Sequence, residues 1–322
     1  MKAKVRQARS WERDSTSGKM VTQWKKEVKR MWTKKAERKF FSWTFEKRNA
    51  KPEQLFYCVE DKHFFYLPTG IRGQGQVMQA RNSWVGEFTE KWAEKFLKPI
   101  VKGLGLHLVR KAVIAEWGLV KQRAADLAIC RKPKLQQPEI DVIALIEVKM
   151  SIVWNWEWKP QEGKIVCAGD FQTHQGRPSV LRSDTVLKAL GKAIEVRSKG
   201  FNGAFFVLCN TPIPDDYQTQ IDGCKRMGVM QGFFSVNPKP LDNKDTLKQT
   251  DFKGYLRWDS SEEAFETLSS LLTKQFHFFS AHLSLDQLGQ LIERASQESS
   301  PQDKARRFLE ALKEVLEDVG ES

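Results

Sequence analysis

Residues 142–149 read VIALIEVK, an apolar run that ends in two charges. Five consecutive apolar residues open this segment, as expected for a strand that is covered on both faces of a sheet. Successive side chains of a strand point to opposite faces, so Glu147 and Lys149 point the same way while Val148 packs opposite. Charges at the end of such a strand need a partner or a solvent-filled cleft. The segment therefore predicts a buried strand with a polar site at its end.

A second lone acid precedes this strand. Asp126 stands in residues 124–129, which read AADLAI, another apolar strand pattern. If the two strands form a hairpin, Asp126 and Glu147 come together. Two carboxylates and a nearby backbone carbonyl would then offer the oxygen ligands that Mg²⁺ prefers. The alternative is that both acids form ordinary salt bridges, with Lys149 among their partners.

The Glu-x-Lys pattern alone means little in this chain. It occurs six times, and context separates the copies, which begin at Glu27, Glu37, Glu60, Glu147, Glu157 and Glu162. The first two fall in a predicted basic helix, the third in a hairpin turn, and the last two at or beyond a strand edge. Only the copy at Glu147 ends a long buried strand.

The surrounding hydrophobic pattern predicts a mixed sheet flanked by helices, an α/β (α+β) fold. The predicted strands of the central region are 107–117, 124–130, 142–149, 152–158, 164–167, 204–209 and 229–236. The predicted helices there run from Asn82 or Ser83 to just before Pro99, over 184–199 and over 215–226. Outside it we predict a basic helix over 20–41, a hairpin over 55–67, and helices over 261–276, 285–295 and 302–319. We divide the chain into a basic Trp-rich region (1–80), a core (81–260) and a C-terminal helical region (261–322).

The core resembles the PD-(D/E)XK nuclease superfamily, the fold of most type II restriction endonucleases. An Asp opens one strand and Glu-x-Lys closes the next, within the order helix, three strands, helix, strand, over about residues 82–210. Ala125 stands where the motif has Pro, a position without a chemical role. The resemblance implies that Asp126 and Glu147 bind the metal and that Lys149 serves the nucleophile.

Many members of that superfamily add an acid from the preceding helix. The candidate here is Glu87, with Glu90 behind it, and an ordinary surface glutamate is the alternative. Lys188 on the next core helix is either a site residue or a solvated lysine. Trp154, Trp156 and Trp158 alternate along one strand face, which favours packing over stacking on bases. The polar loop 172–179, with His174 and Arg177, is a candidate DNA contact.

Charge is concentrated at the N-terminus. Residues 1–50 hold 16 Lys or Arg and 5 Asp or Glu, which gives 11 of the net charge of +13, and four of the eleven tryptophans. Such a segment can replace counterions on a phosphate backbone, so it favours nucleic acid over a basic helix without a partner.

The bulk composition excludes several classes. No apolar run reaches the length of about 20 residues that a membrane-spanning helix needs, and the charged N-terminus lacks the apolar segment of a secretory signal. The five cysteines form no CxxC pair and the five histidines are scattered, so neither a disulfide framework nor a zinc site is expected. We expect an intracellular, cytoplasmic protein.

The sequence thus predicts a Mg²⁺-dependent endonuclease that hydrolyses phosphodiester bonds of double-stranded DNA, with a metal site formed by Asp126, Glu147 and Glu87. As a type II restriction enzyme it would act as a homodimer, with one active site for each strand. Two alternatives stay open. One is a repair or recombination nuclease of the same fold, and the other is a DNA-binding protein without enzymatic activity.

Overall fold

The computed structural model describes residues 31–71, 77, 80–169, 172–236, 247–272 and 285–320. The chain divides into two units, residues 1–278 and 279–322. The expected basic helix over 20–41 lies outside the described residues up to residue 30. Residues 31–33 precede the helix, and from Lys34 on the predicted segment belongs to helix α2 (Lys34–Arg48). No described helix is both long enough and apolar enough to cross a membrane.

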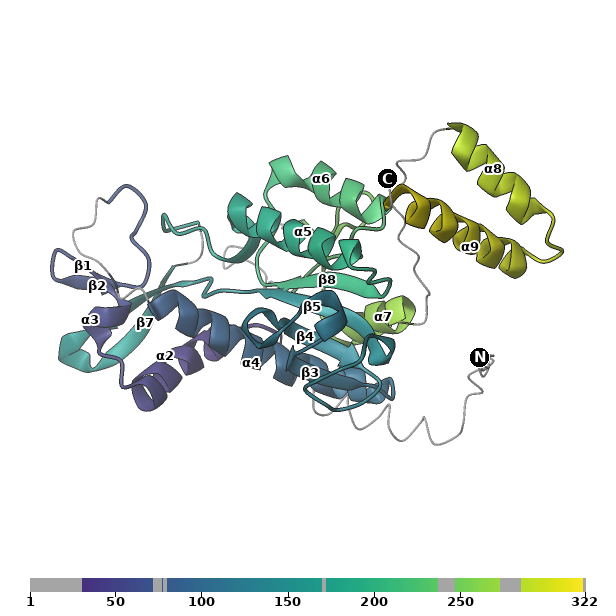
Figure 1. The fold of residues 1–322 in the computed structure, drawn as a ribbon. Helices are drawn as coiled ribbons and strands as arrows, with labels where there is room; N and C mark the ends of the chain where they lie inside the picture. Colours follow the sequence, from purple (N-terminus) through teal and green to yellow (C-terminus); the bar gives the residue numbers. More distant parts are fainter. Residues whose placement is uncertain are drawn as a thin grey trace. The chain divides into compact units, whose positions relative to one another are not determined.

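A six-stranded mixed sheet forms the centre of the first unit (Figure 1). Its strands are β3 (His107–Ala112), β4 (Ala125–Cys130), β5 (Val142–Lys149), β8 (Ala204–Cys209), β9 (Gly232–Ser235) and β10 (Tyr255–Arg257). They lie in the order β10-β9-β8-β5-β4-β3, in which β3, β4 and β5 form an antiparallel meander and β8 pairs parallel to β5. The mixed α/β class expected from the sequence is confirmed at this level.

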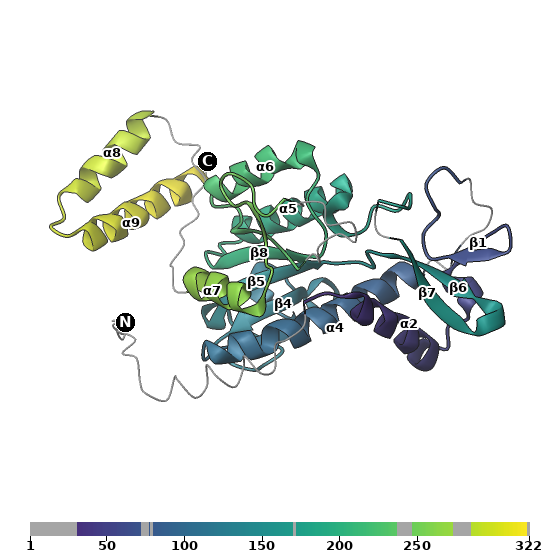
Figure 2. The same ribbon diagram turned by 180° about the vertical axis from the view of Figure 1, so that it is seen from behind.

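Helices cover both faces of this sheet (Figures 1 and 2). They are α4 (Ala80–Gly103) and α7 (Ser261–Leu272) on one face, and α5 (Ser183–Ser198) and α6 (Asp215–Arg226) on the other. Each face has its own buried core. The core on the α4 side includes Leu127 and Ile146, and the core on the α5 side includes Ala128 and Leu145. This alternation is the reason why β4 and β5 appear as continuous apolar runs in the sequence.

A second, four-stranded antiparallel sheet extends the first unit. Its strands are β1 (Tyr57–Val59), β2 (Lys62–Phe64), β6 (Asn155–Lys159) and β7 (Lys164–Gly169), with the short helix α3 (Pro52–Leu55) before them. The predicted hairpin over 55–67 is confirmed, and Glu60 and Asp61 form its turn with positive φ angles of 47° and 64°. Short 3₁₀ turns complete the described connections: Ala115–Trp117, Lys121–Arg123, Glu139–Asp141, Pro160–Glu162 and Ser179–Leu181.

The prediction that Pro99 ends its helix is wrong. Helix α4 continues to Gly103 with Pro99 inside it. An internal proline loses one backbone hydrogen bond and costs about 3 kcal/mol or more. Ile100 and Val101 lie fully buried in the core on the far side of the proline. We attribute the continuation to this burial, because each such side chain contributes about 1.5–3 kcal/mol.

The predicted strand over 107–117 is also too long. Strand β3 ends at Ala112, and a 3₁₀ turn follows at Ala115–Trp117, ending at Gly118 with a φ of 64°. Trp117 is buried in the core on the α5 side. A buried aromatic after a strand is therefore no proof that the strand continues.

The tryptophans at the start of β6 pack inside the protein, as the sequence favoured: Trp154 directly precedes this strand, and Trp156 and Trp158 belong to it. Trp154 and Trp156 are 4% and 0% exposed, and Trp158 is partly buried. Trp156 also contacts the ring of Phe41 on α2. The first two are therefore core residues and not platforms for bases.

Glu37, set aside as part of a basic helix, is fully buried. Its Oε1 accepts hydrogen bonds from the Trp32 indole (2.7 Å) and the Val153 backbone N–H (2.6 Å). Its Oε2 accepts from the Trp156 indole (2.7 Å) and the Trp154 backbone N–H (3.2 Å). One carboxylate thus joins α2 to the connection that follows β5.

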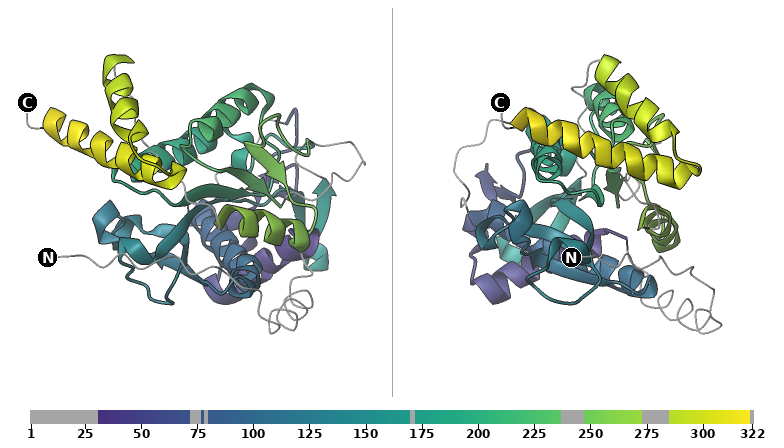
Figure 3. Two further views of the ribbon diagram at one scale, coloured as in Figure 1. Left: turned by 90° about the vertical axis from the view of Figure 1, so that its right-hand side faces the viewer. Right: turned by 45° about the vertical axis from the view of Figure 1, so that its right-hand side comes forward.

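The second unit contains α8 (Leu285–Ser296) and α9 (Pro301–Gly320), which pack against each other (Figure 3). Their contact buries a small core of Leu291, Ala311 and Leu312. An ion pair from Arg294 to Glu314 at 2.5 Å links the two helices. Helix α7, which we expected in the C-terminal helical region, belongs to the first unit.

Candidate active site

The carboxyl end of β5 is held in place by the segments around it. β5 pairs with β4 on one side and with β8 on the other, where Lys149 lies opposite Cys209. The Ser179 hydroxyl donates a hydrogen bond to the backbone carbonyl of Lys149. The Asn210 side chain accepts from the Ser151 N–H at 3.0 Å and donates to the Ser151 carbonyl at 2.7 Å. The end of β5 is therefore held on both sides by hydrogen bonds, which fixes the position of the side chains that it carries.

The structure brings Asp126 and Glu147 together. Leu127 lies opposite Ile146 in the antiparallel pair β4–β5, so the same register places Asp126 opposite Glu147. Oδ2 of Asp126 accepts a hydrogen bond of 3.0 Å from the Val148 backbone N–H. The side chains of Asp126 and Glu147 are 17% and 14% exposed, so both carboxyl groups are shielded yet reachable from solvent.

Lys149 joins this pair. Its ammonium lies 2.6 Å from Oε1 of Glu147, on the same strand face. Burial raises the pKa of Glu147 above its usual range, and the negative charge of Asp126 adds to the rise, while Lys149 and Lys192 of α5 oppose it. A raised pKa beside a second acid is typical of functional sites and also of structural ion-pair networks. The three predicted catalytic residues thus form one cluster.

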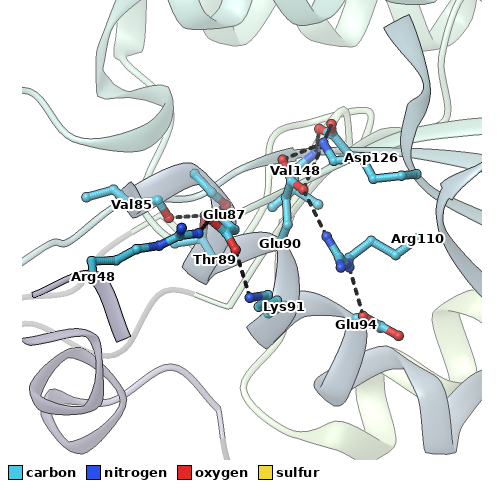
Figure 4. Close-up of polar contacts among 12 residues, drawn as sticks. Arg48, Val85, Glu87, Thr89, Glu90, Lys91, Glu94, Arg110, Asp126 and Val148 are labelled. Atoms are coloured by element: carbon cyan, nitrogen blue, oxygen red, sulfur yellow. Dashed lines mark hydrogen bonds and ion pairs between the residues drawn. The ribbon is translucent and has the colours of Figure 1, made fainter. Parts of the chain in front are cut away.

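Helix α4 presents Glu90 and not Glu87 to this cluster (Figure 4). Glu87 forms ion pairs with Arg48 of α2 and with Lys91, the latter at 2.8 Å. These cations lower the pKa of Glu87 although its partial burial acts the other way. Burial raises the pKa of Glu90, and the negative charge of Asp126 adds to it. The charge of Asp126 therefore acts on Glu90, the acid that the sequence ranked second.

Lys111 of β3 connects Glu90 to Asp126. Its ammonium lies 2.8 Å from both carboxylate oxygens of Glu90 and 3.4 Å from Oδ1 of Asp126. Burial lowers the pKa of Lys111, but the hydrogen bond to Glu90 and the charge of Asp126 outweigh it, so the net shift is upward. Arg110 extends the network, with its guanidinium 3.1 Å from Glu94 and 3.9 Å from Glu90.

Other candidates from the sequence lie elsewhere. His174 is buried, stacks on Tyr66 at a centroid distance of 4.3 Å and lies 3.1 Å from the Val153 carbonyl through Nε2. It is part of the packing of its loop, whereas Arg177 is exposed. Lys188 pairs with Asp184 at 3.2 Å on the exposed face of α5, as the alternative of a solvated lysine predicted.

The acids of the site could hold a magnesium ion if water and phosphate oxygens supplied the other ligands. In the described part of the chain, no three His, Cys, Asp or Glu side chains are grouped closely enough to hold a metal by themselves. Mg²⁺ is usually bound by one or two carboxylates, with waters and phosphate oxygens completing its shell. Asp126 and Glu147 meet that requirement. Oε2 of Glu90, 2.8 Å from the Lys111 ammonium, is a further carboxylate oxygen near this pair.

Sequence reasoning missed Lys111 and Lys192. Lys111 follows an ordinary strand pattern, and its role depends on a positive φ of 56° that the sequence did not indicate. The choice between Glu87 and Glu90 depends on which face of α4 meets the sheet. Thr89, Ala93 and Phe96 are buried on that face. The helical spacing of three from Glu90 to Ala93 could have favoured Glu90.

We compared the chain with family models, with curated proteins and with solved structures, and none of the three comparisons gives a match. The function of the chain is therefore inferred from its own residues and geometry.

Proposed function

We propose that this protein is a Mg²⁺-dependent endonuclease that hydrolyses phosphodiester bonds of double-stranded DNA. One observation carries the proposal. Asp126 and Glu147 lie on neighbouring strands, with Lys149 2.6 Å from Glu147, at the end of a buried central strand. The described element order is α4, β3, β4, β5, α5 and β8, with the β6–β7 hairpin inserted before α5. This is the order in which the PD-(D/E)XK resemblance places the same three residue types.

Each side chain has a distinct task in this proposal. Asp126 and Glu147 would hold the cation beside the scissile phosphate. When bound, Mg²⁺ supplies stabilisation of the phosphate charge and a lower pKa for the attacking water. Lys149 orients that water and offsets negative charge that develops on the phosphorus, as a preorganised cation at a shielded site does. The Val148 N–H fixes the Asp126 carboxylate for this task.

DNA binding in this proposal uses the basic surface of α2. Lys35, Arg38, Lys39, Lys47 and Arg48 are all exposed on that helix. Contacts of this kind position the phosphate backbone and carry no sequence information. We propose a type II restriction enzyme that acts as a homodimer, because cutting both strands takes two copies of the site.

Incubation of the purified protein with phage DNA, with and without Mg²⁺, tests this function. We expect discrete fragments with Mg²⁺ and intact DNA with a chelator, because each carboxylate pair needs its cation for hydrolysis. Gel electrophoresis of linear and circular substrates makes the comparison. Degradation that depends on DNA ends would favour a repair nuclease instead. Binding without cleavage at every Mg²⁺ concentration would leave a DNA-binding protein and overturn the proposal.

A further inference from the structure

The Lys111 ammonium occupies the space between two acids of the candidate site. It lies 2.8 Å from both oxygens of Glu90 and 3.4 Å from Oδ1 of Asp126. These carboxylates come from different elements, α4 and β4, and the ammonium between them offsets their mutual repulsion. In these positions the ammonium neutralises the oxygens that a divalent cation would neutralise.

The backbone is shaped to put Lys111 there. Its φ of 56° lies in the left-handed region, which is uncommon for a residue other than glycine. Val109 and Ala112, three residues apart, both belong to the core on the α5 side. The strand alternation is therefore broken between them, and the two intervening residues, Arg110 and Lys111, both reach Glu90. Backbone strain of this kind clusters at functional sites.

Lys111 and Lys149 differ in their freedom to move. The Lys111 side chain is 45% exposed, so its ammonium can move into water by rotation of its flexible stem. Lys149 is 23% exposed and lies on the rigid end of β5. Lys111 can therefore leave the acids without disturbing the strands.

We propose that Lys111 is a built-in counter-cation, which balances Glu90 and Asp126 while the site holds no metal and is displaced when a divalent cation binds. This inference rests on the proposed function, because it assumes that Asp126 binds a metal. Displacement means competition, so the ammonium lowers the affinity of the site for metal. It also keeps the carboxylates from repelling each other in the metal-free protein.

Calorimetric titration of the full-length protein with Mn²⁺, without DNA and at mildly alkaline pH, tests the inference. Lys111→Met removes the competing charge, and we expect it to bind Mn²⁺ about tenfold more tightly than the wild type, since a neighbouring cation changes a carboxyl equilibrium by about one pKa unit or more. Lys91→Met is the matched control. Lys91 also forms an ion pair of 2.8 Å with a glutamate of α4, but its partner is Glu87, which lies outside the candidate site. We expect its Mn²⁺ affinity to equal that of the wild type.

The possible results separate the two proposals. Lys111→Gln repeats the test with a polar side chain if Lys111→Met does not fold. If the wild type binds Mn²⁺ and the Lys111 variants bind it no more tightly, Lys111 is not a counter-cation. The nuclease proposal then still stands. Failure of both the wild type and the lysine variants to bind Mn²⁺ overturns both. A lower melting temperature of metal-free Lys111→Met, restored by Mn²⁺, supports the inference independently of affinity.

Discussion

Asp126→Asn should lower the rate of DNA cleavage by about a thousandfold or more, since it removes a negatively charged metal ligand. The substitution preserves the shape of the side chain and one acceptor oxygen. The Val148 N–H, 3.0 Å from Oδ2 of Asp126, can therefore still donate its hydrogen bond. We expect an unchanged circular dichroism spectrum and DNA affinity. Single-turnover cleavage of supercoiled plasmid measures the rate.

Glu87→Gln is the matched control for this loss. Glu87 pairs with Arg48 and Lys91, whereas the charge of Asp126 acts on Glu90 and Glu147. The Glu87 variant should cut at the wild-type rate. Lys149→Met should cut slowly, because the ammonium that orients the attacking water and offsets charge on the phosphorus is lost. Cleavage by Asp126→Asn at the wild-type rate would contradict the assignment of the site.

The central sheet could be predicted from the sequence because its strands are buried on both faces. Because they are buried on both faces, residues 125–130 and 142–149 are almost entirely apolar, and an isolated acid in such a run is easily recognised. The helix end at Pro99 could not be predicted in the same way. A local rule favours a stop there, and the burial of Ile100 and Val101, a tertiary effect, overrides it.

The candidate site was predictable to the extent that it depends on strand register. Asp126 and Glu147 meet because β4 and β5 form a hairpin, which their spacing allowed. The place of Glu90 depends on the face of α4 that meets the sheet, which the helical spacing only favours. The place of Lys111 depends on one positive φ angle, which a single sequence does not specify. Glu37 shows the same limit, since its triplet in a basic helix gave no sign of a buried carboxylate.

Near pH 5, Glu37→Gln should reduce the free energy of unfolding by about 3 kcal/mol, because a buried donor left without its acceptor costs about 1–3 kcal/mol. Both carboxylate oxygens of Glu37 accept two N–H groups each. A glutamine places an NH₂ donor against one of these pairs, so two donors lose their partner. Urea denaturation measures the change, and Glu46→Gln on the exposed side of the same helix should be neutral.

The stability of the wild type should also depend on pH through Glu37. Burial raises the pKa of Glu37 from 4.5 to about 8, although its four hydrogen bonds act in the opposite direction. The folded state then holds this proton more tightly than the unfolded state, so the free energy of unfolding falls as the pH rises from about 5 to 8. Glu37→Gln cannot titrate and should lack this contribution, so its deficit relative to the wild type should shrink towards pH 8. Urea denaturation across this range makes the comparison. A deficit that stays constant would mean that the four N–H donors keep the carboxylate ionised throughout.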